Sequence, residues 1–274
     1  MKVLFISLGC DKNLVDTEKM LGQLLEHGHS FTDSEEDADA VVVNSCCFIG
    51  DAKEESIQNI LDMAELKKSG QIKALIVCGC LAQRYREEIR KEIPEVDEVL
   101  GTMATDKIVE ALEQAVAGNT GCYLGALDTL PLADGRRVVT TGGHYAYLKI
   151  AEGCDKHCTY CIIPKVRGDY RSVPMEQLLA EAEDLAEKGV RELILVAQET
   201  TLYGTDLYGK KALPELLKKL EAIPGIVWIR ILYCYPEEIN EELIAAIRDS
   251  SKVCHYLDIP IQHCNDTILR AMRR

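Results

Sequence analysis

Short apolar, β-branched runs alternate with amphipathic stretches along the first 116 residues. The runs predict strands, and the stretches, with their helical spacing of apolar positions, predict helices. The strands are expected at residues 3–7, 40–44, 74–78 and 96–100, and the helices at 13–27, 52–68, 83–92 and 105–116. Strands that alternate with helices favour a doubly wound parallel α/β sheet.

This periodicity is lost between residues 118 and 144, where Gly, Thr, Asn and Pro are frequent, and it resumes afterwards. The gap predicts a linker with a hairpin through residues 136–140. Beyond it, strands are expected at 146–150, 193–197, 227–232 and 256–259, and helices at 175–188, 214–222 and 237–249. Four successive βα units predict part of a (β/α) barrel. We therefore expect an N-terminal domain at 1–117, a linker at 118–144 and a barrel domain at 145–274.

A last helix, at residues 266–274, is still in pattern where the chain ends. Four strands do not close a barrel, and an unclosed sheet leaves an exposed edge. We therefore expect a chain that is incomplete at its C-terminus, with further strands and a further domain to follow.

Composition and charge narrow the class of protein. The 274 residues are 47% hydrophobic, which excludes a disordered chain. The net charge of -14 argues against binding to DNA or to an anionic membrane through bulk charge. The first ten residues superficially resemble a lipoprotein signal, but their apolar run is too short. No stretch reaches the ~18 apolar residues of a membrane span, so we expect a soluble cytoplasmic protein.

The chain has 12 cysteines, fewer than a secreted disulfide scaffold but more than an ordinary cytosolic enzyme needs. The densest group is GCDKHCTYC at residues 153–161, directly after the first strand of the barrel half. Thiolates of Cys154, Cys158 and Cys161 can hold three irons of a 4Fe-4S cluster and leave the fourth iron open to a cofactor. The alternative is a structural zinc loop that borrows His157. The spacing, with Tyr160 before the last cysteine, matches the radical S-adenosylmethionine signature.

The carboxyl ends of barrel strands form the active-site mouth of such folds. Gln198 and Glu199 follow the second strand, Tyr233 follows the third, and Gln262 and His263 follow the fourth. Each of them has an ordinary alternative as a loop or capping residue. We expect Gln198 and Glu199 to contact the amino-acid end or the ribose of the cofactor, beside Tyr160.

A second, dispersed group consists of Cys10, Cys46 and Cys80, each just beyond a strand of the N-terminal sheet. Loops at the carboxyl ends of parallel strands converge on one crevice, so the three thiols can form a second cluster site. The alternative is that they fill the core as small apolar residues. Cys80 is preferred over Cys78 because Cys80 is expected in a loop and Cys78 inside the sheet. The other cysteines are less specific, namely Cys47, Cys122, Cys234, Cys254 and Cys264.

Four motifs resemble those of the methylthiotransferases, a family of radical S-adenosylmethionine enzymes. They are SLGCDKNLVDTE (7–18), NSCCFI (44–49), GCLAQRY (79–85) and YLKIAEGC (147–154). Lys12 and Asn13 follow the first cysteine, and Phe48 and Ile49 follow the second. These residues resemble those of the branch of the family that modifies a ribosomal protein. Asp11 and Ser45 stand where the family often has proline and threonine.

The resemblance implies two 4Fe-4S clusters, one on Cys10, Cys46 and Cys80 and one on Cys154, Cys158 and Cys161. It implies S-adenosylmethionine as cofactor and the insertion of a methylthio group at the β-carbon of an aspartate in small-subunit ribosomal protein number twelve. It also implies the ribosomal protein or the 30S subunit as partner and a low-potential electron donor. No classical catalytic acid, base or nucleophile is required, because the chemistry is borne by the cofactors.

Two alternatives follow from the same residues. One is a methylthiotransferase that acts on adenosine in tRNA, and the other is a non-catalytic iron-sulfur protein that carries electrons. Net charge favours a basic protein substrate over a nucleic acid, since complementary charge assists encounter. The missing fourth cysteine of the 153–161 loop argues against an electron carrier.

Overall fold

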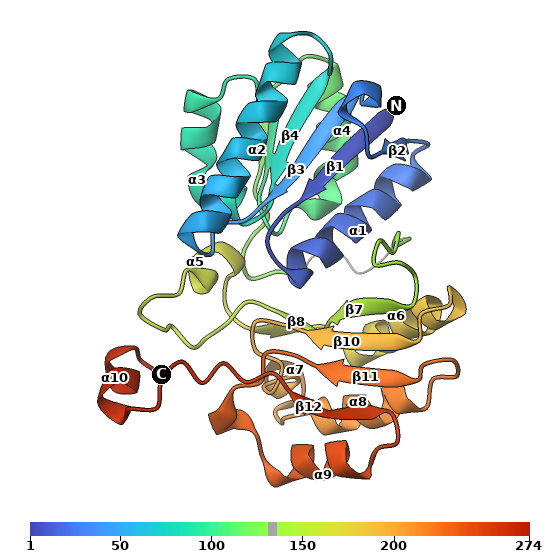
Figure 1. The fold of residues 1–274 in the computed structure, drawn as a ribbon, viewed down its shortest axis with the longest axis vertical. Coiled ribbons are helices and arrows are strands. Elements are labelled where there is room, and N and C mark those ends of the chain that lie inside the picture. Colours follow the sequence, from blue (N-terminus) through green and yellow to red (C-terminus); the bar gives the residue numbers. More distant parts are fainter. Residues whose placement is uncertain (131–135) are drawn as a thin grey trace. The chain divides into compact units, whose positions relative to one another are not determined.

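The computed structural model describes residues 1–130 and 136–274 (Figure 1). The chain separates into two compact units, each built of strands and helices. The N-terminal unit comprises Met1–Val138 and Lys165–Arg167, and the second unit comprises Val139–Pro164 and Gly168–Arg274. The α/β class that the sequence predicts is confirmed, whereas the division into functional domains at 1–117, 118–144 and 145–274 stays a prediction.

The N-terminal unit contains a parallel sheet of six strands in the order β2-β1-β3-β4-β5-β6. The strands are β1 (Lys2–Ser7), β2 (Ser30–Thr32), β3 (Ala40–Ser45), β4 (Ala74–Cys78), β5 (Glu98–Leu100) and β6 (Gly121–Tyr123). The chain first adds β2 on one side of β1 and then returns to add β3 on the other. The carboxyl ends of β1 and β3 therefore border the switch point at which open α/β sheets bind ligands.

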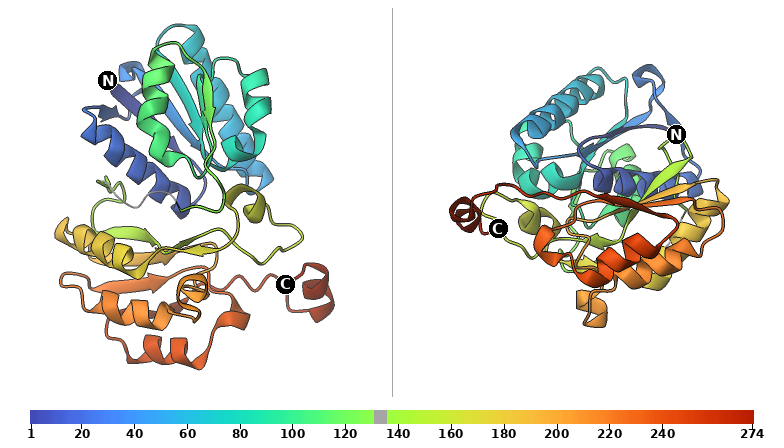
Figure 2. Two further views of the ribbon diagram at one scale, coloured as in Figure 1. Left: turned by 180° about the vertical axis from the view of Figure 1, so that it is seen from behind. Right: turned by 60° about the horizontal axis from the view of Figure 1, so that its bottom comes forward.

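Helices cover both faces of this sheet (Figures 1 and 2). They are α1 (Asp11–Glu26), α2 (Gly50–Lys68), α3 (Gly79–Glu92) and α4 (Ile108–Val116), with short 3-10 turns at Glu35–Asp37 and Thr105–Lys107. Helices α1 and α4 contact each other on one face. Every residue of β3 is buried, as expected for a central strand that is covered on both sides.

The second unit contains a four-stranded parallel sheet in the order β12-β11-β10-β7. Its strands are β7 (Tyr145–Lys149), β10 (Glu192–Val196), β11 (Trp228–Ile231) and β12 (Val253–Leu257), beside the antiparallel pair β8 (Ala151–Glu152) and β9 (Arg171–Ser172). Its helices are α6 (Met175–Glu187), α7 (Thr205–Tyr208), α8 (Leu213–Glu221), α9 (Glu241–Asp249) and α10 (Asp266–Ala271), with a 3-10 turn at Pro236–Glu238. The helix α5 (Ile163–Arg167) ends inside the N-terminal unit.

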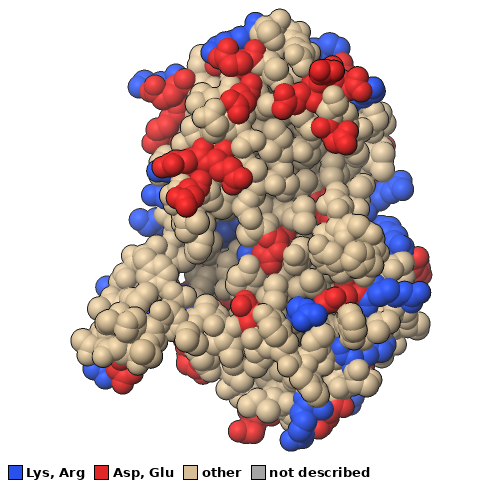
Figure 3. Space-filling model, in the orientation of Figure 1, with Lys and Arg blue, Asp and Glu red and all other residues tan. Residues whose placement is uncertain are grey.

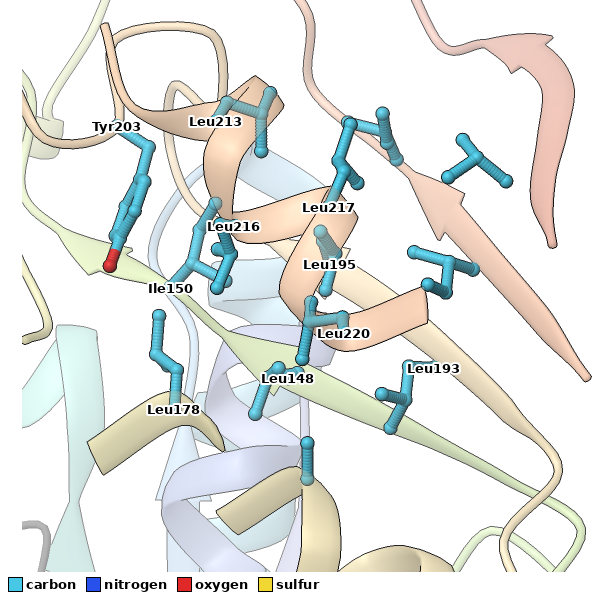
Figure 4. Packing of buried hydrophobic residues seen from close by; sticks show 14 of the residues in the cluster. Leu148, Ile150, Leu178, Leu193, Leu195, Tyr203, Leu213, Leu216, Leu217 and Leu220 are labelled. Carbon is cyan, nitrogen blue, oxygen red and sulfur yellow. The ribbon is translucent and has the colours of Figure 1, made fainter. Parts of the chain in front are cut away.

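The core of the second unit forms between its sheet and helices (Figure 4). Helix α8 contributes Leu213, Leu216, Leu217 and Leu220, all at most 1% exposed. This spacing of three, four and seven residues places the four leucines on one face of the helix. The face packs toward Leu195 of β10, which holds the carboxyl end of that strand in place.

Several expected elements differ from the observed ones. Helix α3 begins at Gly79, four residues before the predicted start, so Cys80 lies in the first helical turn and not in a loop. Tyr85 has a non-helical backbone conformation inside α3, and this kink separates the first turns from the amphipathic stretch that marks the helix in the sequence. The predicted helix at 237–249 begins only at Glu241, because the side chain of Asn240 caps the backbone N–H of Leu243.

Other differences concern short or edge segments. Strand β12 lies at Val253–Leu257, earlier than the predicted 256–259, and the three-residue strands β2 and β6 were not predicted. Residues 136–140 form no strand, so the hairpin predicted there is absent from the described chain. Residues 131–135 of the predicted linker lie outside the described residues. Among the described helices, none is both long and apolar enough to cross a membrane.

One buried carboxyl group gives the N-terminal unit a pH-dependent stability. Glu98 in β5 is 1% exposed, and its Oε2 has no hydrogen-bond partner. Burial, assisted by the charge of Asp97, raises the pKa of Glu98 to about 7. The unfolded chain ionises this group at its ordinary, lower pKa, so the contribution of Glu98 to stability is present in acid and is lost as the pH rises to about 7.

We therefore expect Glu98→Gln to stabilise the protein by up to about 3 kcal/mol at pH 8 and to change little at pH 4.5. Urea unfolding at the two pH values measures the difference, with Glu113→Gln on the surface of α4 as control. Equal pH dependence in the parent and in Glu98→Gln would contradict this assignment.

Candidate iron-sulfur sites

The dispersed cysteines lie at the carboxyl ends of three neighbouring strands. Cys10 is the N-cap of α1 after β1, Cys46 directly follows β3, and Cys80 lies in the first turn of α3 after β4. Burial raises the pKa values of both Cys46 and Cys80, and the charge of Cys10 adds to both shifts, so Cys10 lies near both thiols. The structure therefore brings the three predicted ligands together beside the switch point of the sheet. Cys78 is fully buried at the end of β4, as predicted.

Two glycines permit this convergence. Gly9 has φ +94°, and a Cβ on it would stand 2.7 Å from Cβ and 2.9 Å from Sγ of Cys46. Gly79 has φ +89°, and a Cβ on it would stand 2.6 Å from the carbonyl oxygen of Ser45. Both conformations disfavour other residues, and neither position has room for a side chain. The glycines that precede Cys10 and Cys80 thus let the three loops approach one another.

The side chain of Asn13 joins these loops through hydrogen bonds. Its Nδ2 donates to the carbonyl of Leu8 (2.9 Å) before Cys10 and to the carbonyl of Ser45 (3.2 Å) before Cys46. Its Oδ1 accepts from Arg167 (2.6 Å) and lies 3.9 Å from Sγ of Cys80. Asn13 is fully buried, so water cannot supply hydrogen bonds to its amide, and these protein groups supply them instead.

Further buried bonds fix the same strand ends. Asn44 donates from Nδ2 to the carbonyl of Asn13 (2.8 Å), and the hydroxyl of Ser45 donates to the carbonyl of Cys78 (2.5 Å). The N–H of Cys46 donates to the hydroxyl of Ser56 on α2 (2.9 Å). These bonds fix the backbone that carries the cysteines.

The chemistry of this site suits a bound cation. Burial raises the pKa of Cys46 and raises that of Cys80 to about 12, while the guanidinium of Arg167 opposes both shifts. Thiolates are the form that binds metals, so a bound cation would displace these protons and compensate the buried charge. The donor set of three thiols therefore fits an iron-sulfur cluster.

The second cysteine group lies in the loop after β8. Cys154 and Cys158 are buried and Cys161 is half-buried. Burial raises the pKa of Cys154 to about 11, with smaller contributions from the charges of Cys161 and Cys158. The three thiols are therefore close enough to interact, and as a donor set they also fit a cluster that leaves one iron open.

The first residues of this loop are anchored. The N–H of Cys154 donates to the carbonyl of Gly168 (3.1 Å), and Asp155 accepts from the N–H of Tyr170 (2.7 Å). Lys156 forms an ion pair with Glu238 and lies 5.2 Å from the ring centroid of Tyr235. The loop is thus held by the segments that follow it and by the turn after β11.

A buried ion pair connects this loop to the second strand of the sheet. Lys149 donates to Glu152 (2.8 Å), and Glu152 accepts from Gln198 at the end of β10 (2.9 Å). Lys149 and Glu152 are both buried. The predicted cofactor-binding residue Gln198 is therefore tied to the residue two positions before Cys154.

Two buried oxygen atoms at the end of β10 have no hydrogen-bond partner, Oε1 of Gln198 and Oε2 of Glu199. Glu199 is fully buried, and its Oε1 accepts from the N–H of Thr201 (2.9 Å). Burial raises the pKa of Glu199 to about 7. Buried acceptors without partners are rare in folded proteins, and here they offer places for the donors of a ligand.

The other predicted residues lie as follows. Tyr160 is 50% exposed, and the nearby Cys158 contributes to the raised pKa of its hydroxyl. Tyr233 has φ +60° and is tied to β10 through the N–H of Thr200, which donates to its carbonyl (3.2 Å). Gln262 and His263 are exposed, and His263 accepts from the N–H of Asn265 (2.9 Å) in its own segment. Left-handed φ angles also occur at Gln262 and His157, a pattern common at functional loops.

Within the described residues, no three His, Cys, Asp or Glu side chains are gathered tightly enough to share a single metal ion. The ligands of a four-iron cluster each bind a different iron, so they stand farther apart than the ligands of one ion.

Some residues of these sites were not predicted from the sequence. Arg167, Asp16, Lys149 and Glu152 are all buried charged residues in contact with the cysteine loops or with their neighbours. A signal existed for Asp16, because it shares with Asn13 a helix face that should be apolar in a simple amphipathic helix.

Comparison with known proteins agrees with this geometry. Residues 2–101 match the family model described as uncharacterized protein family UPF0004, and residues 148–274 match that of the Radical SAM superfamily. The radical S-adenosylmethionine methyltransferase TsrM from Kitasatospora setae has a similar fold, with a TM-score of 0.61 and 11% identity over 98% of this chain and 60% of that chain. Residues 148–274, which carry the three-cysteine loop, thus match the Radical SAM superfamily in sequence, and the fold is similar to that of a radical SAM enzyme.

Curated relatives are more specific. The chain is 64% identical, over its full length, to the ribosomal protein uS12 methylthiotransferase RimO of Lachnoclostridium phytofermentans, and spans 62% of that protein. It is 49% identical to the protein of that name from Clostridium tetani, over 98% of this chain and 60% of the relative. Over nearly its whole length the chain is thus similar to proteins named as methylthiotransferases, and it spans about three-fifths of the length of the curated relatives it matches.

We expect Asn13→Ala to lower the free energy of unfolding by at least about 2 kcal/mol. The substitution leaves the buried carbonyls of Leu8 and Ser45 without their donor, and each such group costs about 1–3 kcal/mol. Urea unfolding of the metal-free protein measures the loss. Asn59→Ala is the control, because exposed Asn59 donates only to the carbonyl of Glu55 in its own helix. Equal losses in the two variants would show that Asn13 does not join the loops.

Proposed function

We propose that this chain is the cluster-binding part of a radical S-adenosylmethionine methylthiotransferase that modifies the β-carbon of an aspartate in ribosomal protein uS12. One observation supports the proposal, namely that Cys10, Cys46 and Cys80 follow three neighbouring strands of one sheet while Cys154, Cys158 and Cys161 share one loop after β8. The names of the curated relatives support the choice of substrate.

The reaction explains the need for two sites. A carbon-bound hydrogen on an aspartate side chain is weakly acidic, and a positioned base supplies only about 100- to 10,000-fold rate enhancement. Removal of the hydrogen as an atom avoids this limit, and sulfur and a methyl group must then be supplied. When bound, a 4Fe-4S cluster with S-adenosylmethionine supplies the hydrogen abstraction, and a second 4Fe-4S cluster supplies the sulfur.

The residues have distinct roles in this proposal. Cys154, Cys158 and Cys161 hold the radical cluster, and Cys10, Cys46 and Cys80 hold the auxiliary cluster. Three ligands at each site leave one iron open, in the same way that a catalytic zinc site keeps one open position.

Gln198, Glu199 and Tyr160 form the S-adenosylmethionine site in this proposal. The unpartnered oxygens of Gln198 and Glu199 would accept hydrogen bonds from the amino group or the ribose hydroxyls of the cofactor. Tyr160, half-exposed beside Cys158, would cover the cofactor from the solvent side.

Surface charge supports a basic protein substrate. Figure 3 shows acidic side chains gathered over the N-terminal unit on the face drawn there. The whole chain has a net charge of -14. Complementary charge assists the encounter with a basic partner such as a ribosomal protein, whereas tRNA would be repelled. A cytoplasmic location and a low-potential electron donor complete the proposal.

The first test is the iron content after anaerobic reconstitution with iron and sulfide. We expect about eight irons per chain in the parent and about four in the Cys154→Ala/Cys158→Ala/Cys161→Ala variant, since each cluster holds four. A Cys122→Ala/Cys254→Ala/Cys264→Ala variant is the matched control and should keep about eight. About four irons in the parent and none in the first variant would remove the auxiliary cluster and the proposed function.

The second test separates the substrates. A full-length protein that contains this chain is incubated with 30S subunits and, separately, with tRNA. Mass spectrometry then detects methylthio groups on uS12 and on the tRNA. A gain of one methylthio group on an aspartate of uS12 is expected. The same gain on tRNA would favour the adenosine-modifying branch, and no cleavage of S-adenosylmethionine would favour an electron carrier.

The third test concerns the cofactor site. We expect Glu199→Gln to weaken S-adenosylmethionine binding by about tenfold, because a hydrogen bond to a charged group contributes about 1.5–3 kcal/mol. Equilibrium dialysis with the reconstituted protein measures the affinity. Glu183→Gln on exposed α6 should bind as the parent does, and an unchanged affinity in Glu199→Gln would place the cofactor elsewhere.

A further inference from the structure

The segment that follows the radical-cluster loop enters the N-terminal unit. Lys165–Arg167, at the end of α5, belongs to that unit although it begins only four residues after Cys161 in the sequence. The carbonyl of Val166 accepts a buried hydrogen bond from the hydroxyl of Thr102 (2.6 Å). The segment is thus fixed there by its backbone, and Arg167 at its end is 1% exposed.

The guanidinium of Arg167 contacts two side chains of α1. It donates to Oδ2 of Asp16 (2.8 Å) and to Oδ1 of Asn13 (2.6 Å), both of which are buried. Asn13 is the residue that joins the loops of Cys10 and Cys46. Arg167 therefore binds the side-chain amide of Asn13, which in turn fixes the loops of Cys10 and Cys46.

Arg167 also reaches the third loop. Burial raises the pKa of Cys80, and the charge of Arg167 with a hydrogen bond from its side chain opposes that rise. The same charge opposes the rise that burial causes in the pKa values of Cys46 and Cys47. Burial and the charge of Asp16 raise the pKa of Cys78 inside the sheet, and Arg167 opposes this rise as well. The positive charge of Arg167 thus acts on a group of buried thiols that includes Cys46 and Cys80.

Stability alone does not explain this arginine. A buried ion pair can often be replaced by apolar residues without loss of stability, because the desolvation of both charges opposes their attraction. The N-terminal unit contains a second buried pair, in which Arg137 donates to Glu18 (2.6 Å) on the same helix. Arg137 is not among the groups that shift the pKa of Cys46 or Cys80. It therefore offers a matched comparison.

We infer that Arg167 is a positioning residue for the auxiliary cluster. It orients Asn13 and Cys80 and places a buried positive charge beside the cluster. Arg167 lies in the segment that follows the radical-cluster cysteines in the sequence. The inference rests on the proposed function, since it requires a cluster on Cys10, Cys46 and Cys80. A nearby positive charge stabilises the reduced cluster, because reduction adds an electron. The loss of that charge should therefore favour the oxidised form.

The test uses the Cys154→Ala/Cys158→Ala/Cys161→Ala background, in which only the auxiliary cluster can form. Arg167→Gln, Arg167→Lys and Arg137→Gln are introduced, and the reduction midpoint of the cluster is measured by anaerobic titration followed by electron paramagnetic resonance. We expect Arg167→Gln to shift the reduction equilibrium at least tenfold toward the oxidised form, about 59 mV for a one-electron couple. Arg167→Lys, which keeps the charge, should shift it less, and Arg137→Gln should leave it unchanged.

The same midpoint in Arg167→Gln and Arg137→Gln, with about four irons in each, overturns the role of Arg167 and leaves the proposed function intact. A background that holds no iron overturns both.

If Arg167→Gln does not fold, Arg167→Lys and Arg137→Lys are compared in the same background. A lysine at position 167 cannot contact Asn13, Asp16 and Cys80 together, so we expect Arg167→Lys to lose its cluster to an iron chelator at least tenfold faster than Arg137→Lys. Equal rates of loss would overturn the positioning role.

Discussion

The buried amide of Asn13 is the contact on which the N-terminal cysteine site depends. Three loops that carry cysteines must approach closely at a place where their backbone carbonyls are shielded from water. An amide side chain is suited to this task, because it offers donors to two carbonyls and an acceptor to a cation at once. A carboxylate has no N–H to donate, and an apolar residue would leave the carbonyls unpaired.

The two candidate sites solve the same chemical problem in different ways. In the N-terminal unit, the thiols come from three separate strand ends and are aligned by buried polar side chains. In the second unit, one short loop carries all three thiols and is held near its start by Asp155 and Lys156. A dispersed site depends on the whole sheet, whereas a local loop needs only its anchors. This difference explains why the loop is easily recognised in a sequence and the dispersed site is not.

Much of the fold could be predicted from periodicity, because the central strands are continuous apolar runs and the helices have a clear apolar face. The order of the strands could not be predicted. The edge strands β2 and β6 could not be predicted either, since three residues are too few to show a hydrophobic pattern. The cysteine ligands could be proposed from spacing and from the family resemblance. Arg167 could not, because its partners Asn13 and Asp16 lie more than a hundred residues away in the sequence. Buried pairs of this kind are decided by tertiary structure alone.

The return of Lys165–Arg167 to the N-terminal unit has a consequence for folding during synthesis. Domains generally fold in order as they leave the ribosome. Helix α1 is synthesised early, but Arg167, which donates to Asp16 of this helix, is translated only after the radical-cluster cysteines. The N-terminal unit can collapse before that point, but the ion pair between Asp16 and Arg167 forms only once the chain has been extended to Arg167. The two cysteine sites are therefore completed at nearly the same moment of translation, whatever the order in which their sheets form.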